Sequence, residues 1–196
     1  MTWIKSAVPT TLCCAAASAG TITFTEIIAN ASGSLDGTSF TSQTVTLLLT
    51  GNTSGINNLG GGIYNDPGTA TVSVSGGGTD TFTDSLEVVV AQLSDKAGIY
   101  DVSSSLDVLD VHNVGFATYA LNTSIGPLSG STTGNSGLSY ATVGGTFEFT
   151  SPLNVDHPAS FTAAPGSVPE PGTLSLIGAG IGLLLIRRAA RSSQAR

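Results

Sequence analysis

Apolar residues alternate with threonine and serine at every second position in several segments of this chain. The alternation is clearest around Phe24, Leu47, Val72 and Phe147. Side chains two residues apart on a strand lie on the same face, so this period indicates strands with one buried and one solvent-facing side. No stretch before Gly172 has the 3.6-residue period of an amphipathic helix, and the pattern therefore predicts an all-β domain.

Turn-forming residues separate the expected strands. We predict turns at Asp36-Gly37, Asn65–Gly68, Gly76–Gly78 and Gly144-Gly145. The apolar run Leu86–Leu93 predicts a central strand, and further strands are expected at Tyr100–Val102 and Phe116–Leu121. Short strands with frequent turns predict an antiparallel β-sandwich of roughly seven to ten strands over residues 20–165.

The charge of this domain excludes one class of function. Between Gly20 and Val168 there are twelve acidic residues and one basic residue, Lys96, which gives a net charge of −11. A nucleic-acid interface needs a basic patch, so no nucleic-acid partner is expected. Serine, threonine, asparagine and glycine supply most of the polar surface instead.

Residues 166–196 do not show this alternation and have a different composition. Pro169 and Pro171 hold the backbone around Glu170 in an extended conformation. The uncharged run that follows, about 172–186, would form a helix about 22 Å long, and Arg187, Arg188 and Arg191 come after it. This order predicts one short transmembrane helix with a cytoplasmic basic stop. A buried core helix is the alternative.

Val168-Pro169-Glu170-Pro171, the apolar run and the arginine cluster closely resemble the PEP-CTERM sorting signal. The resemblance implies a substrate of an exosortase in a Gram-negative bacterium that makes extracellular polysaccharide. In that family the motif is read by the processing enzyme, so Glu170 is expected to be a recognition residue. The region Leu106–Phe149 also resembles a recurring ectodomain of this family, which implies architecture and no particular chemistry.

Residues 1–19 are expected to be a signal peptide read by a secretion translocon. Lys5 supplies a positive charge, a mildly apolar stretch follows, and Ala17-Ser18-Ala19 is a small-x-small cleavage site. A poorly ordered N-terminus or a misassigned start is the rival interpretation. Cleavage after Ala19 would remove Cys13 and Cys14, so no disulfide is expected in the mature chain.

Few residues suggest chemistry. Asp110 and His112 would share one face of a strand, but no nucleophile elbow is present, so a partly exposed structural histidine is favoured over a hydrolase base. His157 is expected to be solvated. Two separated histidines do not suggest zinc, and no cofactor is expected. Asp101, Asp107 and Asp110 form a weak calcium candidate, against which solvated loop acids are favoured.

Threonine pairs of the form Thr-x-Thr recur at irregular spacing, for example at Thr21, Thr44, Thr69 and Thr79. Because a surface array would need a fixed period, we interpret them as ordinary solvent-facing strand residues. The expected function is therefore a non-enzymatic protein, exported, anchored briefly in the inner membrane and sorted to the cell surface or extracellular matrix, where it associates with polysaccharide or biofilm. A carbohydrate-binding or carbohydrate-active protein is the alternative, and an ice-binding protein the second.

Overall fold

A computed structural model describes residues 20–151, 153 and 157–166. All of them belong to one compact unit, Ala19–Ser167. The expected signal peptide, sorting motif, membrane segment and basic tail lie outside the described residues.

The described residues are almost entirely strands. Two long strands come first, and ten shorter strands and two short 3₁₀ helices follow. Their order and bounds are β1 (Thr21–Leu35), β2 (Thr38–Asn52), β3 (Asn57–Gly60), β4 (Ile63–Val74), β5 (Gly78–Thr81), β6 (Leu86–Ala91), η1 (Gln92–Ser94), β7 (Lys96–Asp101), β8 (Leu106–His112), η2 (Val114–Thr118), β9 (Ile125–Thr133), β10 (Ser139–Ala141), β11 (Thr146–Phe149) and β12 (Ala159–Pro165).

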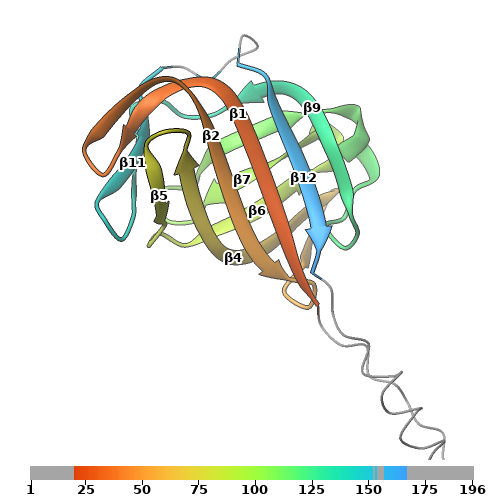
Figure 1. The fold of residues 1–196 in the computed structure, drawn as a ribbon. Coiled ribbons are helices and arrows are strands. Elements are labelled where there is room, and N and C mark those ends of the chain that lie inside the picture. The colour runs from red at the N-terminus through yellow and green to blue at the C-terminus, as the bar shows by residue number, and fades with distance from the viewer. Residues whose placement is uncertain (1–19, 152, 154–156, 167–196) are drawn as a thin grey trace, which may run out of the picture. The chain divides into compact units, whose positions relative to one another are not determined.

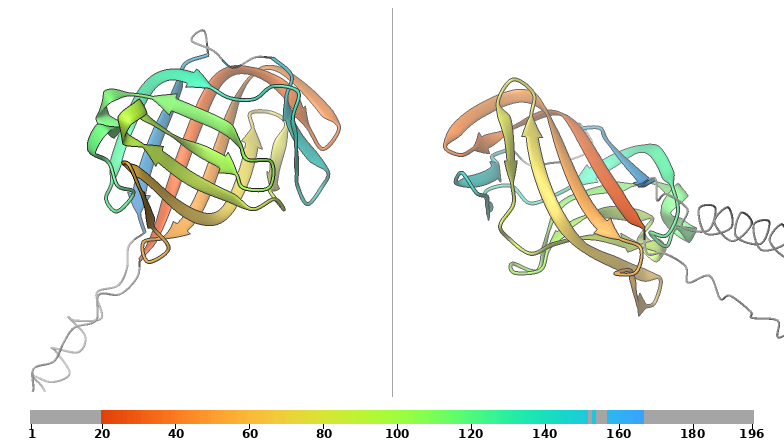
Figure 2. Two further views of the ribbon diagram at one scale, coloured as in Figure 1. Left: turned by 180° about the vertical axis from the view of Figure 1, so that it is seen from behind. Right: turned by 60° about the horizontal axis from the view of Figure 1, so that its bottom comes forward.

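Eight of these strands form a closed antiparallel ring, in the order β1-β12-β9-β8-β7-β6-β4-β2, with β2 pairing back to β1. Strands β1, β2 and β12 run side by side on one side of the molecule, and β6 and β7 cross steeply behind them (Figures 1 and 2). The predicted all-β, antiparallel class is confirmed. Two separate sheets, as in the expected sandwich, are not formed, because hydrogen bonding continues around the whole ring.

Two strands make the corners between the layers. The first half of β4, Ile63–Gly68, pairs with β6, and its second half, Thr69–Val74, pairs with β2. Strand β9 passes in the same way from β12 to β8. The turn predicted at Asn65–Gly68 is therefore wrong: these residues form the bend inside β4, where closely packed layers are joined by strands that change partners.

The interior is apolar, and the alternation places it as the sequence predicts. Ile22, Phe24, Leu47, Val72 and Phe147 are buried almost completely. Aromatic rings fill much of the space, including an edge-to-face pair between Phe116 and Phe161 with centroids 5.3 Å apart. Such pairs add about 0.5–1.5 kcal/mol beyond the burial of their area.

Of the other local predictions, three turns are confirmed and one strand is wrong. The turns at Asp36-Gly37, Gly76–Gly78 and Gly144-Gly145 lie at or between strand ends, as predicted. The strand predicted at Phe116–Leu121 is wrong. Residues Val114–Thr118 form the 3₁₀ helix η2, and the side chain of Phe116 is buried in the core. In the described part of the chain, no helix has the length and apolar character that crossing a membrane requires.

Candidate functional site

Strand β8 carries three of the residues that the sequence analysis selected: Asp107, Asp110 and His112. In a regular strand Asp107 and Asp110 would face opposite sides. The pairing with β7 is irregular here, because Asp107 pairs with Tyr100 and Leu109 with the preceding residue, Ile99. This bulge places both carboxylates on the same side of the sheet. Two consecutive apolar residues, Val108 and Leu109, were the sequence signal for it.

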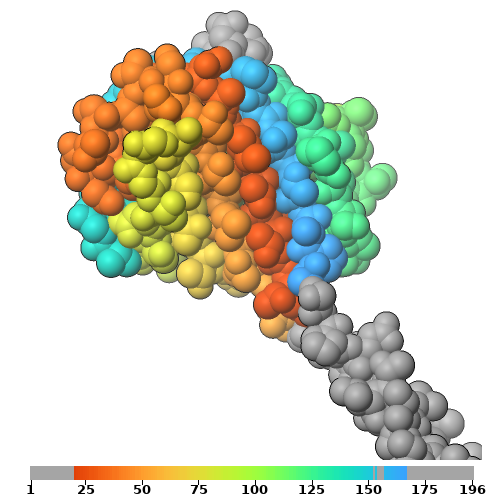
Figure 3. Space-filling model, viewed as in Figure 1, coloured from red at the N-terminus to blue at the C-terminus, as the bar shows by residue number. Residues whose placement is uncertain are grey.

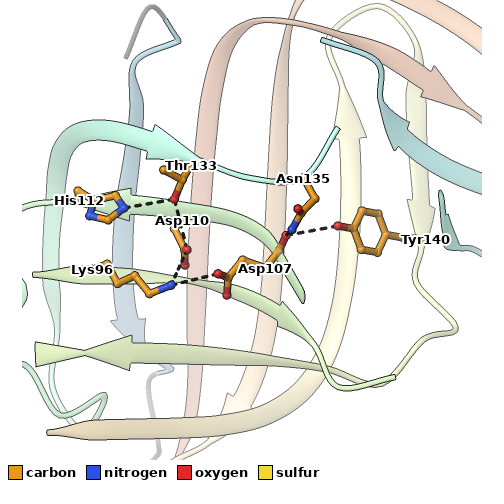
Figure 4. Close-up of polar contacts among 7 residues, drawn as sticks. All are labelled: Lys96, Asp107, Asp110, His112, Thr133, Asn135 and Tyr140. Atoms are coloured by element: carbon orange, nitrogen blue, oxygen red, sulfur yellow. Dashed lines mark hydrogen bonds and ion pairs between the residues drawn. The ribbon is translucent and has the colours of Figure 1, made fainter. Parts of the chain in front are cut away.

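Lys96 on β7 joins the two carboxylates. Its Nζ donates to Asp107 Oδ2 at 3.0 Å and to Asp110 Oδ2 at 2.8 Å (Figure 4). The Asp110 side chain is only 3% exposed, against 25% for Lys96 and 32% for Asp107. Lys96 therefore compensates a carboxylate that would otherwise be buried without a counter-charge.

The protonation of this group follows from its burial. Desolvation raises the pKa of Asp110, and the bond from Lys96 opposes that rise. Burial alone would lower the pKa of Lys96, but its bonds to Asp110 and Asp107 outweigh this effect and raise its pKa. Lys96 thus remains a cation, while Asp110 is a weaker acid than an exposed aspartate.

The network continues onto β9. Thr133 Oγ1 donates to Asp110 Oδ2 at 3.5 Å and is hydrogen-bonded to His112 Nε2 at 3.2 Å. Asp110 and His112 share a face, as predicted, but they meet through Thr133 and not directly. A hydrolase base needs an acid that orients its imidazole, and in residues 20–151 no carboxylate is bonded to His112. The arrangement is that of a structural polar cluster.

Two further bonds hold the start of β8. Asn135 Nδ2 donates to the Asp107 carbonyl at 2.8 Å, and Tyr140 Oη donates to the same oxygen at 3.4 Å (Figure 4). The bulge leaves this carbonyl available, and side chains from the β9–β10 connection and from β10 satisfy it. The segment around Asp107 is therefore tied to both β7 and the β9–β10 connection.

The calcium candidate is not assembled. Asp101 accepts bonds from the Ser103 amide at 2.8 Å and the Ser103 hydroxyl at 2.6 Å. Burial opposes its ionisation, but bonds from Ser103 and Ser104 outweigh that effect and lower its pKa. Asp107 and Asp110 meet Lys96 instead. Among the residues that the structure describes, no three metal-binding side chains come together.

Sequence reasoning missed two carboxylates inside the ring. Glu26 and Asp66 are fully buried, and neither carboxylate makes a hydrogen bond of ordinary geometry within the described chain. Desolvation raises the pKa of Glu26 well above its usual value, with smaller contributions from the charges of Asp110 and Asp107. Burial raises the pKa of Asp66 to about 6. The backbone of Ile99 near Glu26 and that of Asn52 near Asp66 still act to lower the pKa of each group. The signal for Glu26 was its place in the inward series with Phe24 and Ile28.

His157 lies just before β12 and is half-buried, and its carbonyl accepts a bond from the Thr132 hydroxyl at 2.9 Å. The sorting residues Val168, Pro169, Glu170 and Pro171, the arginines at 187, 188 and 191, and the cleavage residues Ala17 and Ala19 lie outside the described residues. Their roles stay predictions from the sequence.

Comparison with known proteins gives one match. The family profile described as the PEP-CTERM protein-sorting motif matches residues 167–190. No curated protein and no solved structure matches this chain. The match contains the Pro-Glu-Pro residues on which the resemblance rested.

Proposed function

The PEP-CTERM sorting signal at residues 167–190 implies export, transient membrane anchoring and processing by an exosortase, and on this basis we propose a function for the β domain after processing. The β domain is a non-enzymatic component of the cell surface or extracellular matrix, where it associates with extracellular polysaccharide or biofilm. The sorting signal is the observation that carries this proposal.

The polar cluster supports a structural role for the acidic residues. Asp107 and Asp110 bind the same lysine, and Thr133 bonds both Asp110 and His112. Glycoside hydrolysis would require two carboxylates facing a sugar across a groove, one held protonated. The Lys96 ammonium occupies the position between these two, which favours a binding or matrix role over a carbohydrate-active one.

The test is the mass and location of the protein in the cells that make it. Membrane, surface and medium fractions are analysed by intact-mass spectrometry. The proposal expects a surface or medium form that lacks residues 1–19 and everything beyond Pro-Glu-Pro. A full-length tail found in the membrane fraction alone would mean a permanent anchor and would contradict it.

A matched pair of deletions tests the motif itself. Removing Pro169–Pro171 is expected to trap the protein in the membrane fraction, because the processing enzyme loses its recognition sequence. Removing Ser192–Gln194, three residues beyond the arginine cluster, is the control and is expected to leave processing unchanged. Equal processing of both variants would contradict the exosortase assignment.

A further inference from the structure

The threonines that are irregular in the sequence are aligned by strand pairing. Thr25 of β1 pairs with Thr162 of β12 and Leu48 of β2, Leu48 pairs with Thr71 of β4, and Thr71 pairs with Thr81 of β5. One row of outward side chains thus crosses five strands. The sequence could not show this row, because its members come from strands separated by connections of different length.

A second row lies beside the first. It runs through Ser160, Ile27, Thr46, Ser73 and Thr79, again across β12, β1, β2, β4 and β5. Successive members of a row lie about 4.8 Å apart, and neighbouring rows about 6.8 Å apart along each strand.

A third row joins Thr23, Thr50 and Thr69 on β1, β2 and β4. We call the outward side of these three rows the hydroxyl face. Figure 3 shows the strands that form it side by side on one side of the domain.

The hydroxyl face carries no charge. In the described parts of its five strands, every acidic residue is directed elsewhere: Glu26 and Asp66 are buried, and Asp80 pairs with the buried Val72. Lys96, the one lysine among the residues that the structure describes, lies on β7. In a domain whose net charge is −11, an uncharged area across five strands limits what can bind there.

The hydroxyls of the face are available to a ligand. Within the described chain, one pair of them is bonded side chain to side chain, Ser73 Oγ with Thr79 Oγ1 at 2.6 Å. The other hydroxyls, such as those of Thr25 and Thr71, have no protein partner there. A hydroxyl both donates and accepts a hydrogen bond, so the best match is a ligand with the same dual capacity.

A hollow with no charged residue in its lining lies near the face, where β2 begins and β4 ends. Its volume is about 280 Å³, and its lining combines the polar Thr41, Gln43 and Ser75 with the apolar Leu35, Phe40 and Val74. Ser75 follows Ser73 by two positions, and its amide donates to the Thr44 carbonyl at 2.9 Å. The Phe40 ring and the hydroxyls of Thr41 and Ser75 offer one sugar ring both apolar and polar contacts.

We propose that the hydroxyl face and its adjoining hollow bind a neutral polysaccharide chain that lies across the strands. The inference rests on the proposed function, because it names the class of glycan and the surface that takes it. An anionic polysaccharide would be repelled by the domain charge and would find no cation on this face. Each net hydrogen bond in water contributes only about 1 kcal/mol, so binding requires contact with several strands at once.

The twist of the sheet favours a flexible polymer over a crystal. Adjacent strands rotate by about 20–25° relative to one another, so the rows turn as they cross the face. A polysaccharide chain can follow that turn, whereas a rigid ice surface meets only a few strands at a time.

The test measures binding of the full chain to defined glycans. Affinity electrophoresis in gels with neutral dextran, and pull-down with cellulose, are compared with anionic alginate. The face variant carries Thr25→Val, Thr46→Val and Thr71→Val, which remove hydroxyls but keep the β-branched shape. The control carries Thr83→Val, Thr118→Val and Thr150→Val, three exposed threonines outside the face. Far-UV circular dichroism and thermal midpoints check that both remain folded.

The wild type and the control are expected to bind a neutral glycan, and the face variant at least about tenfold more weakly. Equal binding by the folded face variant overturns the inference but leaves polysaccharide association intact. Binding to alginate in preference to both neutral glycans also overturns it. Failure of the wild type to bind any of the three removes polysaccharide association itself. Thermal hysteresis of the wild type that the face variant lacks would assign the face to ice, and would overturn the inference too.

Discussion

The carboxylate of Asp110 lies against the bare Cα of Gly98, its partner in the β7–β8 ladder. A Cβ at residue 98 would overlap both that carboxylate and the Leu109 carbonyl. Glycine is therefore required here by space, and the ion pair with Lys96 can form because residue 98 has no side chain.

Replacing Gly98→Ala is expected to destabilise the domain by about 1–3 kcal/mol, because the strand or the ion pair must shift. Urea denaturation measures the change. Gly145→Ala is the control, since its new Cβ would come within 3.3 Å of the Asp36 Cα, a tight contact but not an overlap, and it should cost less than Gly98→Ala, at most about 1 kcal/mol. Equal losses for the two variants would contradict the steric explanation.

Replacing Lys96→Met is expected to cost about 2–3 kcal/mol at pH 8, because it leaves the buried Asp110 carboxylate without its cation. The cost should shrink at pH 5, where Asp110, with its raised pKa, takes up a proton. Adding Asp110→Asn to the Lys96→Met chain should restore part of the stability at pH 8. A double variant no more stable than the single one would show that Lys96 acts through packing alone.

Glu26 makes the domain less stable as pH rises. Its folded pKa lies well above the usual value of 4.5, so above pH 4.5 the folded state binds more protons than the unfolded state. The free energy of unfolding then falls with pH until the folded pKa is passed. Glu26→Gln should remove the Glu26 contribution to this slope, leaving that of Asp66 and Asp110, and stabilise the domain at pH 8 by more than about 1.4 kcal/mol, one pKa unit. Denaturation from pH 4 to pH 8 tests it, and an unchanged slope would refute it.

Asp66 should titrate in the folded protein near pH 6. Burial raises its pKa from 3.8 to about 6, against a smaller opposing effect of the Asn52 backbone. Its contribution to stability is therefore greatest below pH 3.8 and is lost as pH rises to about 6. Carbon-13 NMR of the side-chain carboxyl measures this midpoint directly. A midpoint near 4 would mean that water or a partner reaches the carboxylate.

The strands could be predicted because apolar and polar residues alternate within the sequence of each strand. Phe24, Leu47 and Phe147 are buried where the period of two places them. Closure of the ring could not be predicted from the sequence, because Asn65–Gly68 has the composition of a turn but forms the corner inside β4. At this corner Gly68 packs against the Thr50 carbonyl and Leu49, so the glycine serves close approach and not a tight turn.

The polar sites depended on relationships between strands. The hypothesis that Asp110 and His112 share a face came from their spacing and agrees with the geometry. The joining of Asp107 to Asp110 depends on a bulge that a period of two does not describe. The hydroxyl rows depend on register, which is fixed by pairing partners and turn lengths across the whole domain.

Strand β12 pairs with β1, so the last strand of the ring lies beside the first. The Gly166 amide also donates to the Thr21 carbonyl at 2.7 Å. During synthesis, more than a hundred residues must therefore be added after β1 before β12 can pair with its open edge. This is a long loop closure of the kind that slows folding. Until then β1 and β9 both present unpaired edges that can recruit other chains. The sorting motif begins at residue 167, directly after the strand that completes the ring, so a chain long enough to be sorted is also one that can close its fold.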